Sequence, residues 1–182
     1  MRKKTYFIAA AAITAALYVV LTVFINAFNL ANGMIQIRIS ESLTILPFFT
    51  PAAIPGLTVG CVLSNIIMGN PIPDVIFGSL ATLIGAIGTY LLSRIRLCRT
   101  SWGALLCTIP PVISNGIIIP FVLKYAYELP QSIPVLAAFI VAGEVICCCF
   151  GGGSLLFALR ETPFFRELAA AEQPSDDTES EE

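Results

Sequence analysis

Long apolar runs separated by short polar breaks make up most of this chain. A first run extends from about Tyr6 to Phe28, and three later runs cover about 75–92, 102–123 and 135–159. Each run is close to the roughly 20 residues that an α-helix needs to cross the hydrocarbon core of a bilayer. The pattern therefore predicts a helical membrane protein.

A fifth run, at about 34–68, is too long for a single crossing and is interrupted by prolines between positions 47 and 55. The basic residues decide how often it crosses, because Lys and Arg collect in cytoplasmic loops. Two crossings place the N-terminal Arg2 and the basic loop at 94–99 on the same, cytoplasmic side. One crossing would put them on opposite sides, so we interpret this run as two helices.

We therefore expect an all-α membrane protein with six transmembrane helices and both termini in the cytoplasm. Residues 1–166 form one transmembrane domain in this interpretation. The segment 167–182 forms an acidic, disordered tail, because it is small and polar and lacks the apolar residues that a core needs. The expected helices cover about 6–29, 34–50, 53–69, 74–93, 102–122 and 135–158.

The composition agrees with this class of protein. Hydrophobic residues make up 57% of the chain, charged residues 12%, and the mean hydropathy is +0.86, values far from those of soluble domains. The net charge of −2 conceals a basic membrane part, because seven of the twelve acidic residues lie in 167–182. The basic start resembles a signal peptide, but the first apolar run exceeds the about 7 to 15 residues of a signal-peptide core.

Several kinds of chemistry are excluded by what the chain lacks. It contains no histidine, which removes imidazole as a base, proton carrier or metal ligand. Three of its six cysteines are consecutive, Cys147 to Cys149, and none has the spacing of a metal site. We expect the cysteines to pack as small apolar residues, and we expect no metal and no cofactor.

The polar residues within the apolar runs all fall toward the predicted outer side, while the inner halves of the helices carry no ionisable group before their ends. Ionisable side chains are costly in lipid and normally face a bundle interior, where they serve a site. The pattern favours an outward-opening pocket with a closed floor. The candidate residues are Arg38, Glu41, Asn65, Asp74, Asn115 and Glu144.

Two structural alternatives stay open at this point. Arg38 and Glu41 lie three residues apart on one helix face and can pair with each other alone, which leaves Asp74 and Glu144 unexplained. Phe77 and Tyr125, with Phe28, can stack on a flat ligand or anchor the helices at the membrane interface. The excess of carboxylates indicates a ligand rich in hydrogen-bond donors, with a cationic group among them.

Four segments of the chain resemble, in order and spacing, the QueT family of substrate-binding S components of energy-coupling factor (ECF) transporters. They are IQIRISESLTILPFFTPAAIPGLTVGC, DVIFGSLATLIGA, PPVISNGIIIP and GEVICCCFGGGSLLFAL. The resemblance covers about 2–159 and implies six helices, an outward-side pocket and a bacterial plasma membrane location. It also implies a queuosine precursor as ligand, either queuine or a deazaguanine base, with the six candidate residues as its contacts.

The same resemblance implies partners. S components dock on a transmembrane coupling subunit through small residues of the first helix, and Ala11 with Ala15, or Ala12 with Ala16, fit that pattern. Packing within the chain is the alternative use of these alanines. Two ATPase subunits complete an ECF module, since the chain itself has no GxxxxGK[ST] phosphate-binding motif.

We expect no enzymatic activity and no nucleic-acid partner, only the small ligand, the module subunits and membrane lipid. Two other functions stay open from the residues alone. One is an S component for a different vitamin, because the fold is shared and the ligand is set by pocket side chains. The other is a small proton-coupled secondary transporter, since Glu41, Asp74 and Glu144 are able to titrate.

Overall fold

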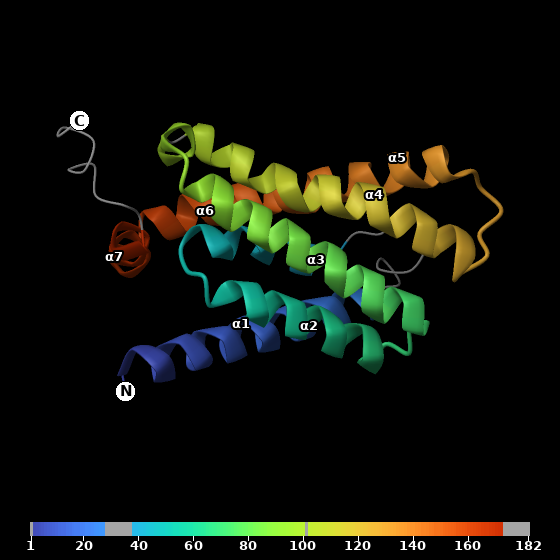
Figure 1. Cartoon of the computed structure of the whole chain (residues 1–182), viewed down its shortest axis with the longest axis horizontal. Helices are drawn as coiled ribbons and strands as arrows, with labels where there is room; N and C mark the ends of the chain where they lie inside the picture. The colour runs from blue at the N-terminus through green and yellow to red at the C-terminus, as the bar shows by residue number, and fades with distance from the viewer. Residues whose placement is uncertain (1, 28–37, 101, 173–182) are drawn as a thin grey trace, which may run out of the picture.

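A computed structural model describes residues 2–27, 38–100 and 102–172, and these are almost entirely helical, with no β-strand among them. Four helical stretches are long and apolar enough to cross a membrane: Lys4–Asn26, Ile72–Ser93, Gly103–Tyr125 and Ile133–Arg160. They pack lengthwise into an elongated bundle (Figure 1). The predicted class, an all-helical membrane protein, is confirmed.

The first, third and fourth of the expected helices are each a single α-helix. Helix α1 covers Arg2–Asn26, and α2 covers Ala53–Ile67. Helix α3 covers Ile72–Ser93, with Pro71 at its N-cap and Pro73 in its first turn. Proline is tolerated there because the backbone N–H groups of a first helical turn have no partner within the helix.

The last two membrane-length stretches each combine an α-helix with a second helical form. A 3₁₀ helix, η3 (Gly103–Thr108), leads into α4 (Ile109–Tyr125), whose first turn contains Pro110 and Pro111. In the final rod, α5 (Ile133–Glu144) continues through a π-helical stretch, η4 (Val145–Gly152), into α6 (Gly153–Arg160). Stretches of π-helix are rare and occur often at functional sites.

The run at 34–68 differs most from its prediction. Its described part forms a short 3₁₀ helix, η1 (Ile39–Phe48), and then α2, both of which are shorter than a full membrane crossing. Pro47 lies inside η1, and Pro51 and Pro55 follow it, so regular α-helical hydrogen bonding is interrupted there. The count of six spans and the cytoplasmic orientation therefore stay predictions.

The ends of the described chain lie at one end of the bundle. The start of α1 and the last helix, α7 (Pro163–Glu172), are both found there, while the α2–α3 turn and the α4–α5 loop lie at the other end (Figure 1). Helix α7 reaches Glu172, so the first part of the predicted disordered tail is helical. The remainder, 173–182, lies outside the described residues.

Glycines allow the closest helix contacts. A Cβ added at Gly56 would lie 2.6 Å from the Ala11 carbonyl oxygen, and one at Gly60 would lie 2.8 Å from Tyr18 Cβ. Helices α1 and α2 therefore approach each other at backbone contact, which requires small residues at these positions. Gly85 has the same role between α3 and α4, where its added Cβ would meet Pro111 Cα at 2.7 Å.

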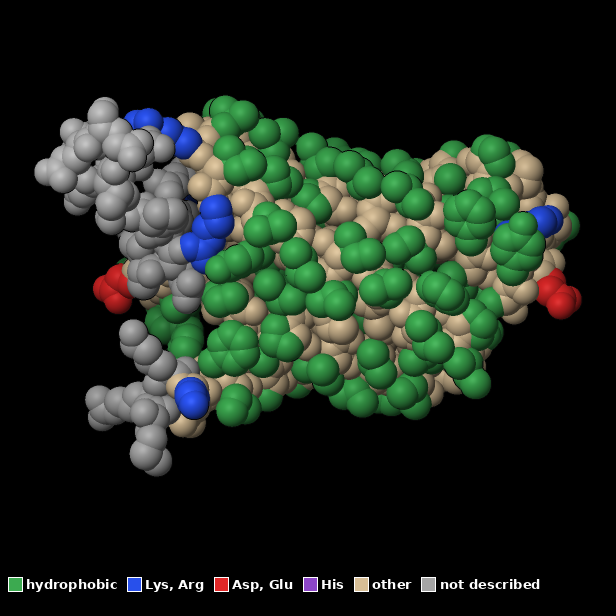
Figure 2. All heavy atoms as spheres, in the orientation of Figure 1, with side chains coloured by type: hydrophobic (Ala, Val, Ile, Leu, Met, Phe, Trp, Pro, Cys, Tyr) green, Lys and Arg blue, Asp and Glu red, His purple; other side chains and the backbone are tan. Residues whose placement is uncertain are grey.

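The outer surface is apolar along the middle of the bundle. Figure 2 shows hydrophobic side chains spread over the visible face and charged side chains at its two ends. Many large apolar residues are exposed, including Ile13, Val20, Ile84, Ile117 and Phe150. In water such a surface would be unfavourable, whereas lipid solvates it well, which matches a membrane-embedded bundle.

A buried polar site inside the bundle

The helix η1 is enclosed by the rest of the bundle and carries the centre of the site. It packs against α1, α3 and η4, and its residues from Ser40 to Ile45 are all buried. A 3₁₀ helix has three residues per turn, so Arg38, at its N-cap, and Glu41 lie above one another on one face. Two polar groups extend from these two residues.

The first group, which we call the outer group, is centred on Asp74 in the first turn of α3. Arg38 Nη2 lies 3.5 Å from Asp74 Oδ2, with 12% and 2% of the two side chains exposed. The same oxygen accepts hydrogen bonds from Asn70 Nδ2 at 3.0 Å and from the Tyr127 hydroxyl at 2.8 Å. Asp74 Oδ2 is therefore matched by one cationic and two neutral donors within the chain.

Asn65 and Tyr127 complete the outer group. Asn70 Nδ2 also donates to Asn65 Oδ1 at 2.9 Å, and Asn65 Nδ2 lies 3.4 Å from the Asp74 carbonyl oxygen. Burial, reinforced by the Asp74 carboxylate, raises the pKa of the Tyr127 phenol, so this hydroxyl stays protonated and donates. The group ties the α2–α3 turn and the α4–α5 loop to the start of η1.

The second group, the inner group, contains the other two carboxylates. Glu41 is 1% exposed, and its Oε1 accepts a hydrogen bond from the Tyr18 hydroxyl of α1. Glu144, at the end of α5, is 8% exposed; its Oε1 accepts from Asn115 Nδ2 at 2.9 Å, and its Oε2 lies 3.2 Å from Cys148 Sγ. Five elements, α1, η1, α4, α5 and η4, thus converge on this group.

The inner group has one buried acceptor without a donor. The Glu41 Oε2 atom is buried and forms no hydrogen bond within the described part of the chain. One carboxylate oxygen of Glu41, one of Glu144 and the Cys148 sulfur all lie within 4.8 Å of one another. A buried acceptor left without a donor costs about 1 to 3 kcal/mol. Among the described residues, these three side chains have the geometry to surround a cationic group.

All six predicted site residues lie within the described chain, and all but Arg38 expose less than a tenth of their surface. The structure divides them between the two groups: Arg38, Asn65 and Asp74 in the outer one, and Glu41, Asn115 and Glu144 in the inner one. The alternative in which Arg38 and Glu41 pair only with each other is wrong, because their partners are Asp74 and Tyr18.

Sequence reasoning missed four members of the site. Tyr18 and Tyr127 gave no signal, because tyrosines near helix ends and within spans are usually interface or packing residues. Asn70 stands in a turn between Gly69 and Pro71, where an asparagine is ordinary. Cys148 was expected to be a packing residue; it is buried, but it also contacts Glu144 and lies 3.5 Å from the Glu41 carbonyl oxygen.

The alanines of α1 divide between two faces. Ala11 and Ala15 face α2, where they contact Gly56 and Gly60, so the structure assigns them to packing within the chain. Ala12 and Ala16 are exposed. The docking expectation is therefore restricted to this second pair.

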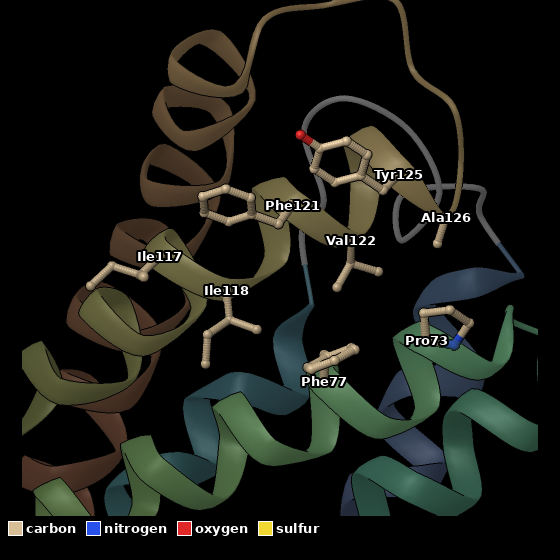
Figure 3. Close-up of a pocket in the computed structure, with 8 residues that line it drawn as sticks. All are labelled: Pro73, Phe77, Ile117, Ile118, Phe121, Val122, Tyr125 and Ala126. Atoms are coloured by element: carbon tan, nitrogen blue, oxygen red, sulfur yellow. The ribbon is translucent and has the colours of Figure 1, made fainter.

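A hollow between α3 and α4 lies outside the polar site. It has a volume of about 530 Å³ and is lined by apolar side chains and Tyr125 (Figure 3). Phe77 and Tyr125 line it with 47% and 72% of their surfaces exposed. These two aromatic residues thus lie on the outer surface of the bundle, as expected for interface anchors, while Phe28 lies outside the described residues.

Fold and site together define a multi-pass protein of the cell membrane that encloses a polar site. Residues 8–161 match the QueT transporter family, and the chain belongs to that family. The predicted family is thereby confirmed, and it is a family of transporters.

One relative is 40% identical over 96 residues: the queuosine precursor transporter QueT of Lactococcus lactis subsp. cremoris (strain MG1363). The aligned part covers 52% of this chain and 56% of the relative, so it spans little more than half of either protein. No solved structure matches the chain significantly.

Proposed function

We propose that this protein is the membrane-embedded substrate-binding subunit, or S component, of an ECF-type importer for a queuosine precursor. It captures queuine or a deazaguanine base from the outer side, and partner subunits supply the ATP hydrolysis. The observation that carries the proposal is the unpartnered Glu41 carboxylate oxygen in a buried, family-matched site. The name of the Lactococcus relative supports the choice of ligand class.

The site has the polar groups that such a ligand requires. A deazaguanine base presents a donor edge of parallel N–H groups, which a carboxylate accepts in a bidentate way. The inner group offers two carboxylates for this purpose, and Asn115 and Tyr18 hold one oxygen of each in place. Ligand donors that reach Glu41 Oε2 would remove the penalty of a buried acceptor without a partner.

Transport by this chain requires partners in the proposed function, because the sequence contains no motif for ATP. The partners are a transmembrane coupling subunit and two ATPase subunits. Ala12 and Ala16 support docking of the coupling subunit, since they are exposed, small and four residues apart on α1. A helix of the partner is able to approach the α1 backbone closely there.

Calorimetric titration of the purified protein in detergent tests the ligand half of this proposal. The ligands are queuine, the aminomethyl and nitrile deazaguanines, guanine, thiamine and riboflavin. Binding of at least one deazaguanine, with the vitamins silent, is the expected result. Binding of a vitamin alone would keep an S component and overturn the ligand.

Uptake in cells that express the chain with and without ECF coupling and ATPase subunits tests the other half. Uptake should require those subunits. Uptake that persists without them and collapses when the proton gradient is dissipated would instead identify a proton-coupled secondary transporter.

A further inference from the structure

The spacing of the acceptors in the inner group is narrow and specific. The Glu41 and Glu144 oxygens and the Cys148 sulfur lie within 4.8 Å of one another. These side chains come from η1, the end of α5 and η4, so the spacing is set by how three elements pack. Within this spacing the Cys148 thiol lies 3.2 Å from Glu144 Oε2, at hydrogen-bond distance, whereas Glu41 Oε2 has no hydrogen-bond partner within the described part of the chain.

A single nitrogen atom fits this spacing. Two oxygens that each accept an N–H bond of about 2.8 Å from one tetrahedral nitrogen lie about 4.6 Å apart. A primary ammonium group has three N–H donors. The two carboxylates can accept two of them, and the Cys148 sulfur, whose own thiol donates to Glu144 Oε2 at 3.2 Å, is a weak acceptor for the third. A planar guanine edge, by contrast, places its two parallel donors on the two oxygens of one carboxylate.

The charge of the inner group matches as well. Glu41 and Glu144 are both buried, and the Arg38 side chain forms its ion pair with Asp74 in the outer group. Two carboxylates within 4.8 Å repel one another in a medium of low dielectric. A positive group between them removes that repulsion and supplies the donor that Glu41 Oε2 lacks.

We propose that the inner group binds a protonated primary amine of the ligand between Glu41 and Glu144, with Cys148 as the third acceptor. This inference rests on the proposed function and narrows its ligand class: among the deazaguanine bases, one with an aminomethyl group binds more tightly than one with a nitrile. The outer group, in which Asp74 Oδ2 already has its donors, closes the site and makes no contact with the amine.

The test compares the aminomethyl and nitrile deazaguanines, which differ only at this group, on the parent protein and on Glu144→Gln. Loss of one member of a buried charge pair is costly, so the aminomethyl compound should lose about 100-fold or more in affinity. The nitrile compound, which places no charge there, should lose less than about 5-fold. Glu161→Gln, the same change at an exposed residue, is the matched control and should leave both affinities unchanged.

The outcomes separate this inference from the function on which it rests. Equal affinity of the parent for the two compounds, or an equal loss of both in Glu144→Gln, would overturn the amine site and leave the deazaguanine function standing. Binding of neither compound and no binding of queuine, while the protein still unfolds cooperatively, would overturn the function itself. Saturable binding of Zn²⁺ or Na⁺ that depends on Glu144 and excludes the aminomethyl compound would replace the amine with a metal ion and so overturn the inference.

Glu41→Gln provides a second test if Glu144→Gln proves too unstable to purify. It removes the other carboxylate charge and keeps an amide oxygen that can accept from Tyr18. The same selective loss of the aminomethyl compound is expected. An unchanged ratio of the two affinities in this variant would contradict the proposed site.

Discussion

Arg38 forms its ion pair with Asp74, at a distance of 3.5 Å between Nη2 and Oδ2, although Glu41 lies only one 3₁₀ turn away. The pair joins the start of η1 to the first turn of α3. It leaves Glu41 to bond with Tyr18 and to face Glu144. Arg38 therefore places its charge in the outer group, and the inner group keeps a negative charge available for a ligand.

The Arg38–Asp74 pair should show strong coupling in a double-mutant cycle. Either Arg38→Met or Asp74→Asn leaves one buried charge alone, which typically lowers the free energy of unfolding by about 3 to 5 kcal/mol. The double variant removes both charges and should lose much less than the sum of the two. Unfolding in detergent measures all three. Additive losses would show that the two charges do not interact.

Tyr18→Phe should destabilise the protein without changing its shape. The variant removes only the hydroxyl that donates to Glu41 Oε1, and the loss of a donor to a buried acceptor costs about 1 to 3 kcal/mol. The free energy of unfolding measures the effect. Tyr6→Phe is the control, because that side chain is 43% exposed; equal effects of the two variants would contradict the role assigned to the Tyr18 hydroxyl.

Gly60→Ala should loosen the contact between α1 and α2. Its new Cβ would lie 2.8 Å from Tyr18 Cβ and 3.0 Å from the Ala15 carbonyl oxygen, and overpacking of this kind costs about 1 to 3 kcal/mol. Because Tyr18 is displaced, ligand affinity should fall together with thermal stability. Val59→Ala, next to it but 49% exposed, is expected to leave ligand affinity unchanged.

Ala12→Trp and Ala15→Trp should have different effects, although the two residues are close in sequence. Ala12 is exposed, so a bulky side chain there should preserve ligand binding and abolish uptake with the partner subunits. Ala15 is 8% exposed against Gly60, so its variant should lower stability and ligand binding. Titration and uptake assays on both variants measure the difference. Normal uptake by Ala12→Trp would remove the support for docking on this face.

The apolar pattern alone determined the class of this protein and its four long spans. Hydrophobic runs near 20 residues have few stable places other than a membrane, and this holds whatever their neighbours are. The same local reasoning marked Arg38, Glu41, Asp74 and Glu144 as buried site residues, since an ionisable group inside such a run is costly unless it has partners. The family followed from segments that resemble QueT in order and spacing, and the match at 8–161 confirms it.

Only the tertiary structure decided which residues meet. A helix turns about 100° per residue, so Ala11 and Ala12 point to different faces, and no local pattern says which one packs on Gly56. Cys148 lies four residues after Glu144 and meets it within one helical rod, whereas the packing of η1 against η4 brings Glu41 to both of them. The pairings of Arg38 with Asp74 and of Tyr18 with Glu41 depend on how η1 packs against α3 and α1, because each joins elements that are distant in sequence.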